Sequence, residues 1–232
     1  LHGGGLSWWN YREAAELLQS EYNIILPVLD GHANSDRPFT TIEDNASEII
    51  SFIDEHLNGS VLLIGGLSLG GQILLEMLSE RGNLCSFALV ESAAVIPSRM
   101  TNALIAPFFG SSYSLIRNRR FARMQFQSLH IKPDLFDDYY RDTCQIKKRD
   151  MIAFLKANTS YKLKDTIRKS SAKIHICYGE RETGEIRKSA EAICREIPSC
   201  KLHSLKGLYH GEFSMNHADR HADAIRQIIH EG

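Results

Sequence analysis

Short apolar runs alternate along this chain with longer segments in which apolar residues recur at helical spacing. The short apolar runs fall at residues 24–29, 61–64 and 87–90, and further strands are predicted at 173–178 and 201–205. Apolar runs of this length, bounded by glycine or polar residues, predict strands that are buried on both faces. Helices are predicted in the segments between and after these runs, at 41–57, 70–80, 185–196 and 216–230. Because repeated β-then-α units give parallel strands covered by helices, we expect a three-layer α/β fold with a mostly parallel sheet.

The alternation stops between residues 97 and 168. This stretch has few β-branched runs and many helix formers, and it predicts four short helices near 101–109, 113–128, 133–144 and 147–160. We therefore expect a core made of residues 1–96 and 169–232, with residues 97–168 inserted as a helical lobe. The arginine-rich cluster at 117–120 is expected to lie on a solvated helix face.

Composition and charge narrow the class of protein. Hydrophobic residues make up 43% and charged residues 24% of the 232 residues, which excludes disordered and coiled-coil chains. The formal net charge is −1, and we find no basic face of the kind that binds nucleic acid. The longest uncharged apolar run, at 61–75, is interrupted by glycines and falls short of the ~20 apolar residues of a membrane span.

The cysteines and the start of the chain bear on the compartment. The five cysteines are odd in number and lack metal-ligand spacing, so we expect buried or free thiols in a reducing compartment. No signal peptide is visible, which favours a cytoplasmic protein. The chain opens at Leu1 directly inside a motif, so we expect residues upstream of it in the native protein and leave open a removed leader.

The motif Gly-Leu-Ser-Leu-Gly at 66–70 is the most specific feature of the sequence. It follows the predicted strand 61–64 and opens a predicted helix, which is the setting of a nucleophile elbow. Such a turn holds its serine in a strained backbone conformation, and the glycines on either side leave room for the neighbouring strand and helix. A phosphate-binding loop is disfavoured, because no Gly-Lys-Ser/Thr and no G-x-G-x-x-G spacing is present. Ser68 is therefore the candidate nucleophile.

A serine hydroxyl needs a base and a carboxylate that orients the base. His210 follows the last predicted strand and is the candidate base, while Glu182, with Glu180 as the alternative, follows the strand before it. His217 and His221 are one helical turn apart, but no third ligand is evident and we expect them on a solvated helix face. We predict no metal.

The first residues complete the candidate site. Leu1-His2-Gly3-Gly4-Gly5 reads as the end of a strand that enters a glycine-rich loop. Backbone amides in such a loop can point at a developing oxyanion. We expect the amides of Gly4 and Leu69 to form this oxyanion hole.

These residues together resemble the α/β-hydrolase family. The chain order Ser68, Glu182, His210 is that family's order, and residues 30–36 resemble its loop after the fourth strand, where His32 would be structural. Three departures stand out: Ala33 replaces a usual glycine, the acid is a glutamate where aspartate is commoner, and a bulky Tyr209 that could narrow the pocket precedes the base. The resemblance implies the α/β-hydrolase fold, with the inserted helices as a cap or lid.

The activity implied is acyl transfer to water without a cofactor. A small ester, thioester or lactone is the expected substrate. Five side chains of the cap either line an apolar pocket for it or form the core of the cap itself: Phe108, Phe109, Tyr113, Met124 and Phe126. Because one fold hosts many functions, three alternatives stay open: a carbon–carbon bond hydrolase, an acyltransferase, and a ligand-binding receptor that retains the triad. The sequence makes no prediction of oligomeric state.

Overall fold

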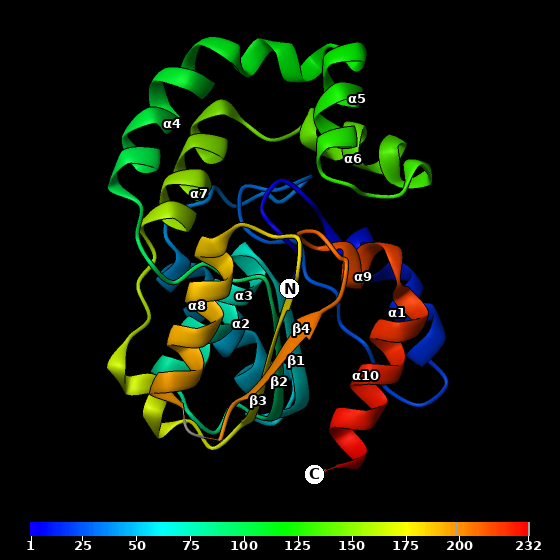
Figure 1. Cartoon of the computed structure of the whole chain (residues 1–232), viewed down its shortest axis with the longest axis vertical. Helices are drawn as coiled ribbons and strands as arrows, with labels where there is room; N and C mark the ends of the chain where they lie inside the picture. The colour runs from blue at the N-terminus through cyan, green and yellow to red at the C-terminus, as the bar shows by residue number, and fades with distance from the viewer. Residues whose placement is uncertain (198, 232) are drawn as a thin grey trace.

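A parallel four-stranded sheet forms the centre of the computed structural model (Figure 1). The structure describes residues 1–197 and 199–231. Positions 198 and 232, which belong to the predicted core segment, lie outside the described residues. The strands of the sheet run in the order β1-β2-β3-β4, and every neighbouring pair is parallel. Their bounds are Val61–Leu67 (β1), Cys85–Glu91 (β2), Lys173–Gly179 (β3) and Lys201–Leu205 (β4). All four carboxyl ends therefore lie at one edge of the sheet.

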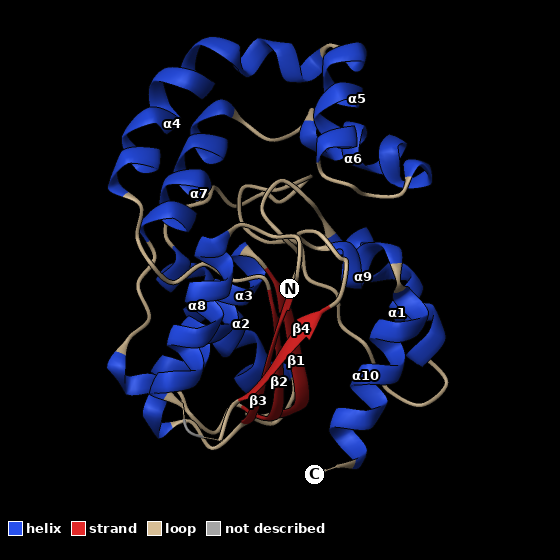
Figure 2. Cartoon of the chain, viewed as in Figure 1, coloured by secondary structure: helices blue, strands red, loops and turns tan. Residues whose placement is uncertain are grey.

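Helices cover both faces of the sheet, as the expected three-layer fold requires (Figures 1 and 2). One face carries α2 (Ile42–His56), α3 (Leu69–Glu80) and α8 (Gly184–Glu196). The other face carries α10 (Ala218–His230), with α1 (Arg12–Leu18) and α9 (Glu212–Asn216) beside it. The larger core lies on the α3 side, where Ile73, Leu74 and Met77 are fully buried against the sheet. Burial of this apolar surface is the main stabilising contribution to the fold.

The inserted helices lie beyond the carboxyl ends of the strands (Figure 1). They are α4 (Arg99–Ser112), η2 (Tyr113–Arg117), α5 (Arg119–Ser128), η3 (Pro133–Leu135), α6 (Phe136–Thr143) and α7 (Lys148–Ser160). The single helix predicted at 113–128 is divided at Asn118, whose Oδ1 accepts the amides of Arg120 and Phe121 at 3.0 and 3.2 Å. An asparagine cap of this kind starts a new helix. The apolar periodicity continues across Asn118, so the periodicity alone predicted a single helix.

The predicted strand at 24–29 is wrong. No strand is assigned there, and the elements η1 (Trp8–Tyr11), α1 and η4 (Asp165–Lys169) were not predicted. Pro27 has no amide hydrogen to donate to a ladder, and the Leu29 amide donates to His2 Nε2 at 3.0 Å instead of to a backbone carbonyl. Leu1 lies alongside β1 instead, and its carbonyl oxygen accepts the Leu67 amide at 3.0 Å.

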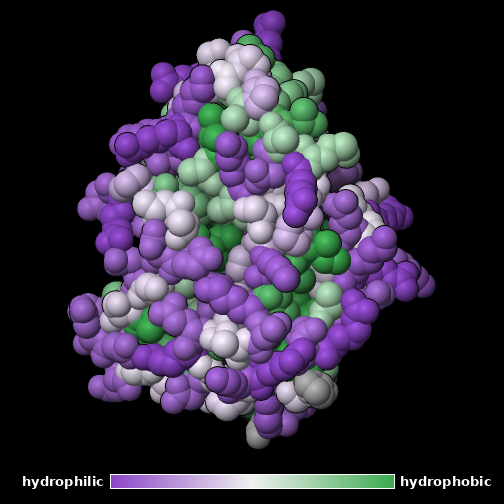
Figure 3. All heavy atoms as spheres, turned by 90° about the vertical axis from the view of Figure 1, so that its left-hand side faces the viewer, coloured by the Kyte–Doolittle hydropathy of each residue, from purple (hydrophilic) through white to green (hydrophobic). Residues whose placement is uncertain are grey.

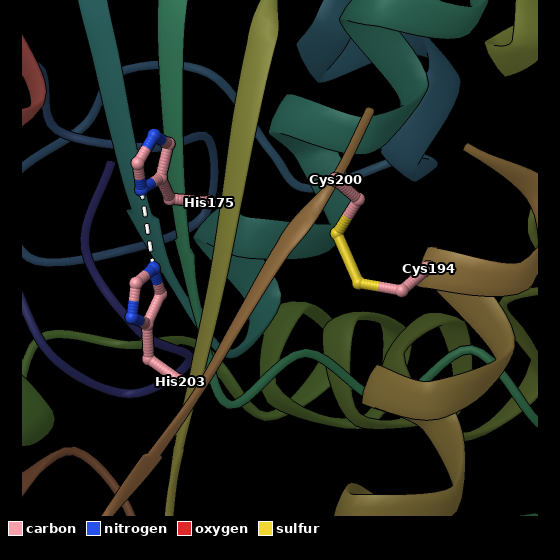
Figure 4. Close-up of a disulfide and its surroundings, with 4 residues drawn as sticks. All are labelled: His175, Cys194, Cys200 and His203. Carbon is pink, nitrogen blue, oxygen red and sulfur yellow. Dashed lines mark hydrogen bonds between the residues drawn. A yellow bond between two sulfur atoms is a disulfide. The ribbon is translucent and has the colours of Figure 1, made fainter. Parts of the chain in front are cut away.

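The expectation that all five cysteines are free thiols is also wrong. Cys194 on α8 and Cys200 before β4 form a disulfide, on the opposite side of β3 and β4 from the paired imidazoles of His175 and His203 (Figure 4). Their Cα atoms are 5.3 Å apart, inside the usual range for a disulfide. Spacing along the chain did not reveal this pairing. The argument from cysteine usage for a reducing compartment therefore fails for this pair.

Across residues 1–197 and 199–231, every helix is too short or too polar to cross a bilayer.

Candidate active site

Ser68 lies on the turn between β1 and α3 in a strained backbone conformation. Its φ and ψ are 52° and −111°, a region that side chains other than glycine rarely adopt. The Ser68 amide donates to the Glu91 carbonyl at 2.8 Å, which fixes the turn against β2. A β-carbon at Gly66 would collide with the Gly70 carbonyl, and one at Gly70 with the Leu1 carbonyl. The two glycines of the motif are thus required by close backbone approaches.

Gly4 and Leu69, whose amides are the predicted oxyanion donors, are neighbouring residues beside this turn. A β-carbon placed on Gly4 would be 3.6 Å from Leu69 Cβ. Leu69 is the first residue of α3, where backbone amides have no partner within the helix. Within the described residues, neither amide donates to a protein acceptor. The residues predicted to supply the oxyanion donors are therefore neighbours, and their amides have no acceptor among the described residues.

His210 and Glu182 form a hydrogen-bonded pair at the edge of the sheet. His210 Nδ1 lies 2.7 Å from Glu182 Oε2, the imidazole being about half exposed and the carboxylate buried. The other carboxylate oxygen, Oε1, accepts the Ser92 hydroxyl at 2.7 Å and the Gly179 amide at 2.6 Å. Burial raises the pKa of Glu182, but these hydrogen bonds and the imidazole outweigh it, so the pKa lies below its ordinary value. The buried carboxylate is therefore ionised beside the imidazole.

Glu180, the alternative acid, points elsewhere. Its Oε2 accepts the Gly207 amide at 3.0 Å, and its own amide donates to the Leu205 carbonyl. The carboxylate of Glu180 thus stabilises the turn after β4. Geometry favours Glu182 as the partner of the imidazole.

The turn that carries Ser68 contacts the loop that carries His210. A β-carbon at Gly211 would lie 3.2 Å from Leu67 Cδ2, so the residues next to Ser68 and His210 pack against each other. Among the described residues, no hydrogen bond joins Ser68 Oγ to His210. Catalytic hydrogen bonds of this kind are often long in a free enzyme and tighten when substrate binds.

The ring of Tyr209 is held in a stack beside His210. It lies face to face with His130, with centroids 3.8 Å apart and planes at 7°, and the Arg181 guanidinium lies over it at 5.4 Å. His130 follows α5 and has a φ of 57°, which places it in the left-handed region. These contacts tie the inserted helices to the loops that carry Glu182 and His210.

Two other histidines, His2 and His32, have structural surroundings. His2 accepts the Leu29 amide at Nε2, so its proton is on Nδ1, which donates to the Gly3 carbonyl at 2.9 Å. His32 is buried and stacks on Phe154 at 4.4 Å, and burial lowers its pKa to about 4. Ala33, in the place of a usual glycine, has a φ of 42°.

The expectation of a solvated face at His217 and His221 is wrong for His221. That side chain is buried between Tyr11 and Phe213, and burial lowers its pKa to about 4. The fold places α1 against α10, so this face of α10 is covered. Polarity alone did not reveal the covering helix.

A buried polar chain connects the glycine-rich loop to β2, and sequence reasoning missed it. The Gly3 amide donates to Asn10 Oδ1 at 3.2 Å, and Asn10 Nδ2 donates to Ser214 Oγ at 3.3 Å. The Ser214 amide in turn lies 3.4 Å from Glu91 Oε1. Ser92, with a φ of 57°, follows Glu91 directly and contacts Glu182. The sequence signal available for Glu91 and Ser92 was their position directly after the predicted strand at 87–90.

Glu91 is fully buried, and its Oε2 has no hydrogen-bond partner among the described residues. Burial raises the pKa of Glu91 from 4.5 to about 7. Where folding raises the pKa of a carboxyl, the free energy of unfolding of the protein falls as the pH rises from the unfolded-state pKa to the folded-state pKa.

We therefore expect the substitution Glu91→Gln to stabilise the protein at pH 8 but not at pH 4. Both states of the wild type hold the Glu91 proton at pH 4, whereas at pH 8 the folded state carries a buried charge. The gain at pH 8 is on the order of 3 kcal/mol. Urea unfolding of both proteins at the two pH values measures it, and a difference independent of pH would contradict the assignment.

A serine on a strained strand-to-helix turn, an imidazole with a buried carboxylate, and a parallel sheet between helices define the α/β-hydrolase class of folds. The chain belongs to the alpha/beta hydrolase family, whose model matches residues 1–226. A sequence search of curated proteins finds no match.

Several solved structures share the fold at low sequence identity. The esterase EaEST from Exiguobacterium antarcticum is 19% identical to this chain with a TM-score of 0.82, and the match covers 99% of this chain and 90% of that esterase. A thermophilic esterase from Thermogutta terrifontis is 16% identical with a TM-score of 0.79, covering 99% and 88%. The epoxide hydrolase CorEH is 14% identical with a TM-score of 0.76, covering 99% and 89%. At these identities the likeness shows the fold.

Proposed function

We propose that this protein is a serine hydrolase that cleaves a small carboxylic ester, thioester or lactone through an acyl-enzyme intermediate. The observation that carries the proposal is the hydrogen bond between His210 and the buried Glu182, beside the strained turn of Ser68. The esterases among the similar structures support it.

In this mechanism each residue has one role. His210 takes the Ser68 proton as the hydroxyl oxygen attacks the substrate carbonyl, and Glu182 holds the imidazole in the required tautomer and stabilises its cation. The amides of Gly4 and Leu69 donate to the oxyanion. The leaving group departs with the proton from His210, and a water activated by His210 then releases the acid.

We further propose that residues 97–168 form a cap over this site. Two contacts support it: Phe154 of α7 would lie 3.5 Å from a β-carbon on Gly4, and the Gln72 side chain of α3 donates to the Asn158 carbonyl at 2.9 Å. Phe126 is buried within the inserted helices, whereas Phe108 and Met124 are exposed. For these three of the five candidate pocket side chains, the observed burial or exposure therefore argues against a pocket-lining role.

The test combines labelling with turnover. A fluorophosphonate should label the protein at one site, which peptide mapping should place at Ser68, and labelling should abolish hydrolysis of p-nitrophenyl acetate. Labelling without multiple turnover of any ester in a series of acyl chain lengths and leaving groups would favour the ligand-binding receptor instead. Hydrolysis that survives complete labelling would remove Ser68 from the mechanism.

A further inference from the structure

The charge of this protein is distributed unevenly. Residues 97–168 contain fourteen lysines and arginines, six aspartates and no glutamate, a net charge of +8 against −9 for the remainder. No acidic residue occurs between Ser92 and Pro133, a stretch that holds α4, η2 and α5. The near-zero net charge of the whole chain hides this basic segment, so the expectation of no basic face, which was drawn from that net charge, does not hold for it.

The same stretch exposes large apolar side chains. Met100, Leu104 and Phe108 follow one another at intervals of four residues on α4, so they share one face, and their exposed fractions are 78%, 61% and 62%. Leu115 on η2 and Met124 on α5 are also exposed. We call these five residues the rim patch. Hydrophobic side chains gather in the upper part of the face that α4 borders (Figure 3).

The orientation of α4 is fixed, so this exposure follows from the fold. On its inner face Ile105 is buried, and Asn102 donates to the Lys156 carbonyl and to Thr159 Oγ1 of α7, both at 2.8 Å. A helix that is apolar on both faces is normally covered on both. The outer face of α4 is open, and it lies at the end of the molecule away from the C-terminus (Figure 1).

Three cations lie next to residues of the rim patch along the chain. Arg99 begins α4, Arg117 ends η2, and Arg120 lies four residues before Met124 on α5. All three are exposed, and they form no ion pair with the residues that the structure describes. Apolar side chains flanked by unpaired cations fit an anionic lipid surface, in which the former enter the acyl boundary and the latter meet headgroup phosphates.

We propose that the rim patch docks this protein on an anionic lipid membrane surface, with α4 lying in the interface. A second copy of the chain fits less well, because a symmetric contact through this face would bring Arg99 and Arg117 near their own copies. A nucleic acid would match the cations but leave Leu104 and Phe108 without a partner. The inference does not depend on the chemistry of Ser68.

The test is co-sedimentation of the protein with lipid vesicles. Wild-type protein should bind vesicles of equal parts phosphatidylcholine and phosphatidylglycerol, bind phosphatidylcholine alone more weakly, and be released by salt, which screens the headgroup charge. The double variant Leu104→Ser/Phe108→Ser should lose at least about a hundredfold in partitioning. Arg117→Gln/Arg120→Gln should lose about fivefold per cation on the anionic vesicles.

The matched control replaces a leucine and a phenylalanine that are exposed outside the rim patch. Leu17 on α1 and Phe52 on α2 are 45% and 42% exposed, and Leu17→Ser/Phe52→Ser should bind as the wild type does. Thermal unfolding by circular dichroism checks that all variants are folded. The proposal is overturned if the wild type fails to bind the anionic vesicles or the control loses as much as the rim variant. It is also overturned if binding persists without Leu104 and Phe108, or if sedimentation shows a dimer that the rim variant abolishes.

Discussion

Replacing Ser68 by alanine is expected to reduce the hydrolysis of p-nitrophenyl acetate by about a millionfold, or to the detection limit. The substitution removes the attacking oxygen, so no acyl-enzyme can form and only binding and oxyanion stabilisation remain. Initial rates at saturating substrate, with single-turnover controls for contaminating esterase, measure the loss.

Two further variants make this result specific. Ser68→Gly should be equally inactive but more stable by about 1 kcal/mol, because glycine adopts the φ of 52° without strain. Ser92→Ala, which removes a neighbouring hydroxyl that contacts Glu182, should retain far more activity than either. Undiminished hydrolysis by the Ser68→Ala variant would contradict the proposed mechanism.

The second large effect is expected at the acid. Glu182→Gln should lower kcat by about ten-thousandfold, because an amide neither stabilises the imidazolium nor enforces the required tautomer. The substitution keeps the shape of the side chain, and circular dichroism should show an unchanged fold. Rates on the same ester across the pH range measure the effect.

Glu180→Gln is the matched control, since it makes the same chemical change two residues away. Its carboxylate accepts the Gly207 amide and faces away from the imidazole, so kcat should change by no more than about threefold. The reverse pattern, with Glu180 essential and Glu182 dispensable, would reassign the acid.

The layered fold was predictable because local patterns carry it. The apolar runs of β1 and β2, the strand patterns of β3 and β4, and the periodicity of α2, α3 and α8 are local properties, and their alternation favours a parallel sheet between helices. The run at 24–29 has the same apolar character but contains Pro27. Which groups its backbone amides bind depends on the tertiary structure, which pairs the Leu29 amide with His2. Asn118 shows the converse, since a cap residue divided a stretch whose periodicity is continuous.

The candidate site was predictable to the extent that it is encoded in short motifs. Ser68 and its flanking glycines form one such motif, and the order of Ser68, Glu182 and His210 matches a known family. Ser92, Asn10 and Glu91 carry no motif, and their positions are decided by which strand ends and loops meet. The Cys194–Cys200 disulfide and the burial of His221 were missed for the same reason.

By itself the sequence determined the class of fold, the place of the candidate nucleophile on its turn and the separation of a basic, acid-poor insertion from an acidic core. These depend on residue type, spacing and charge, which are local or additive quantities. Only the tertiary structure decided that Glu182 and not Glu180 faces His210, that Gly4 lies beside Leu69, and that one face of α4 is open. Those outcomes depend on distances between residues far apart in the chain, which packing sets and no local pattern records.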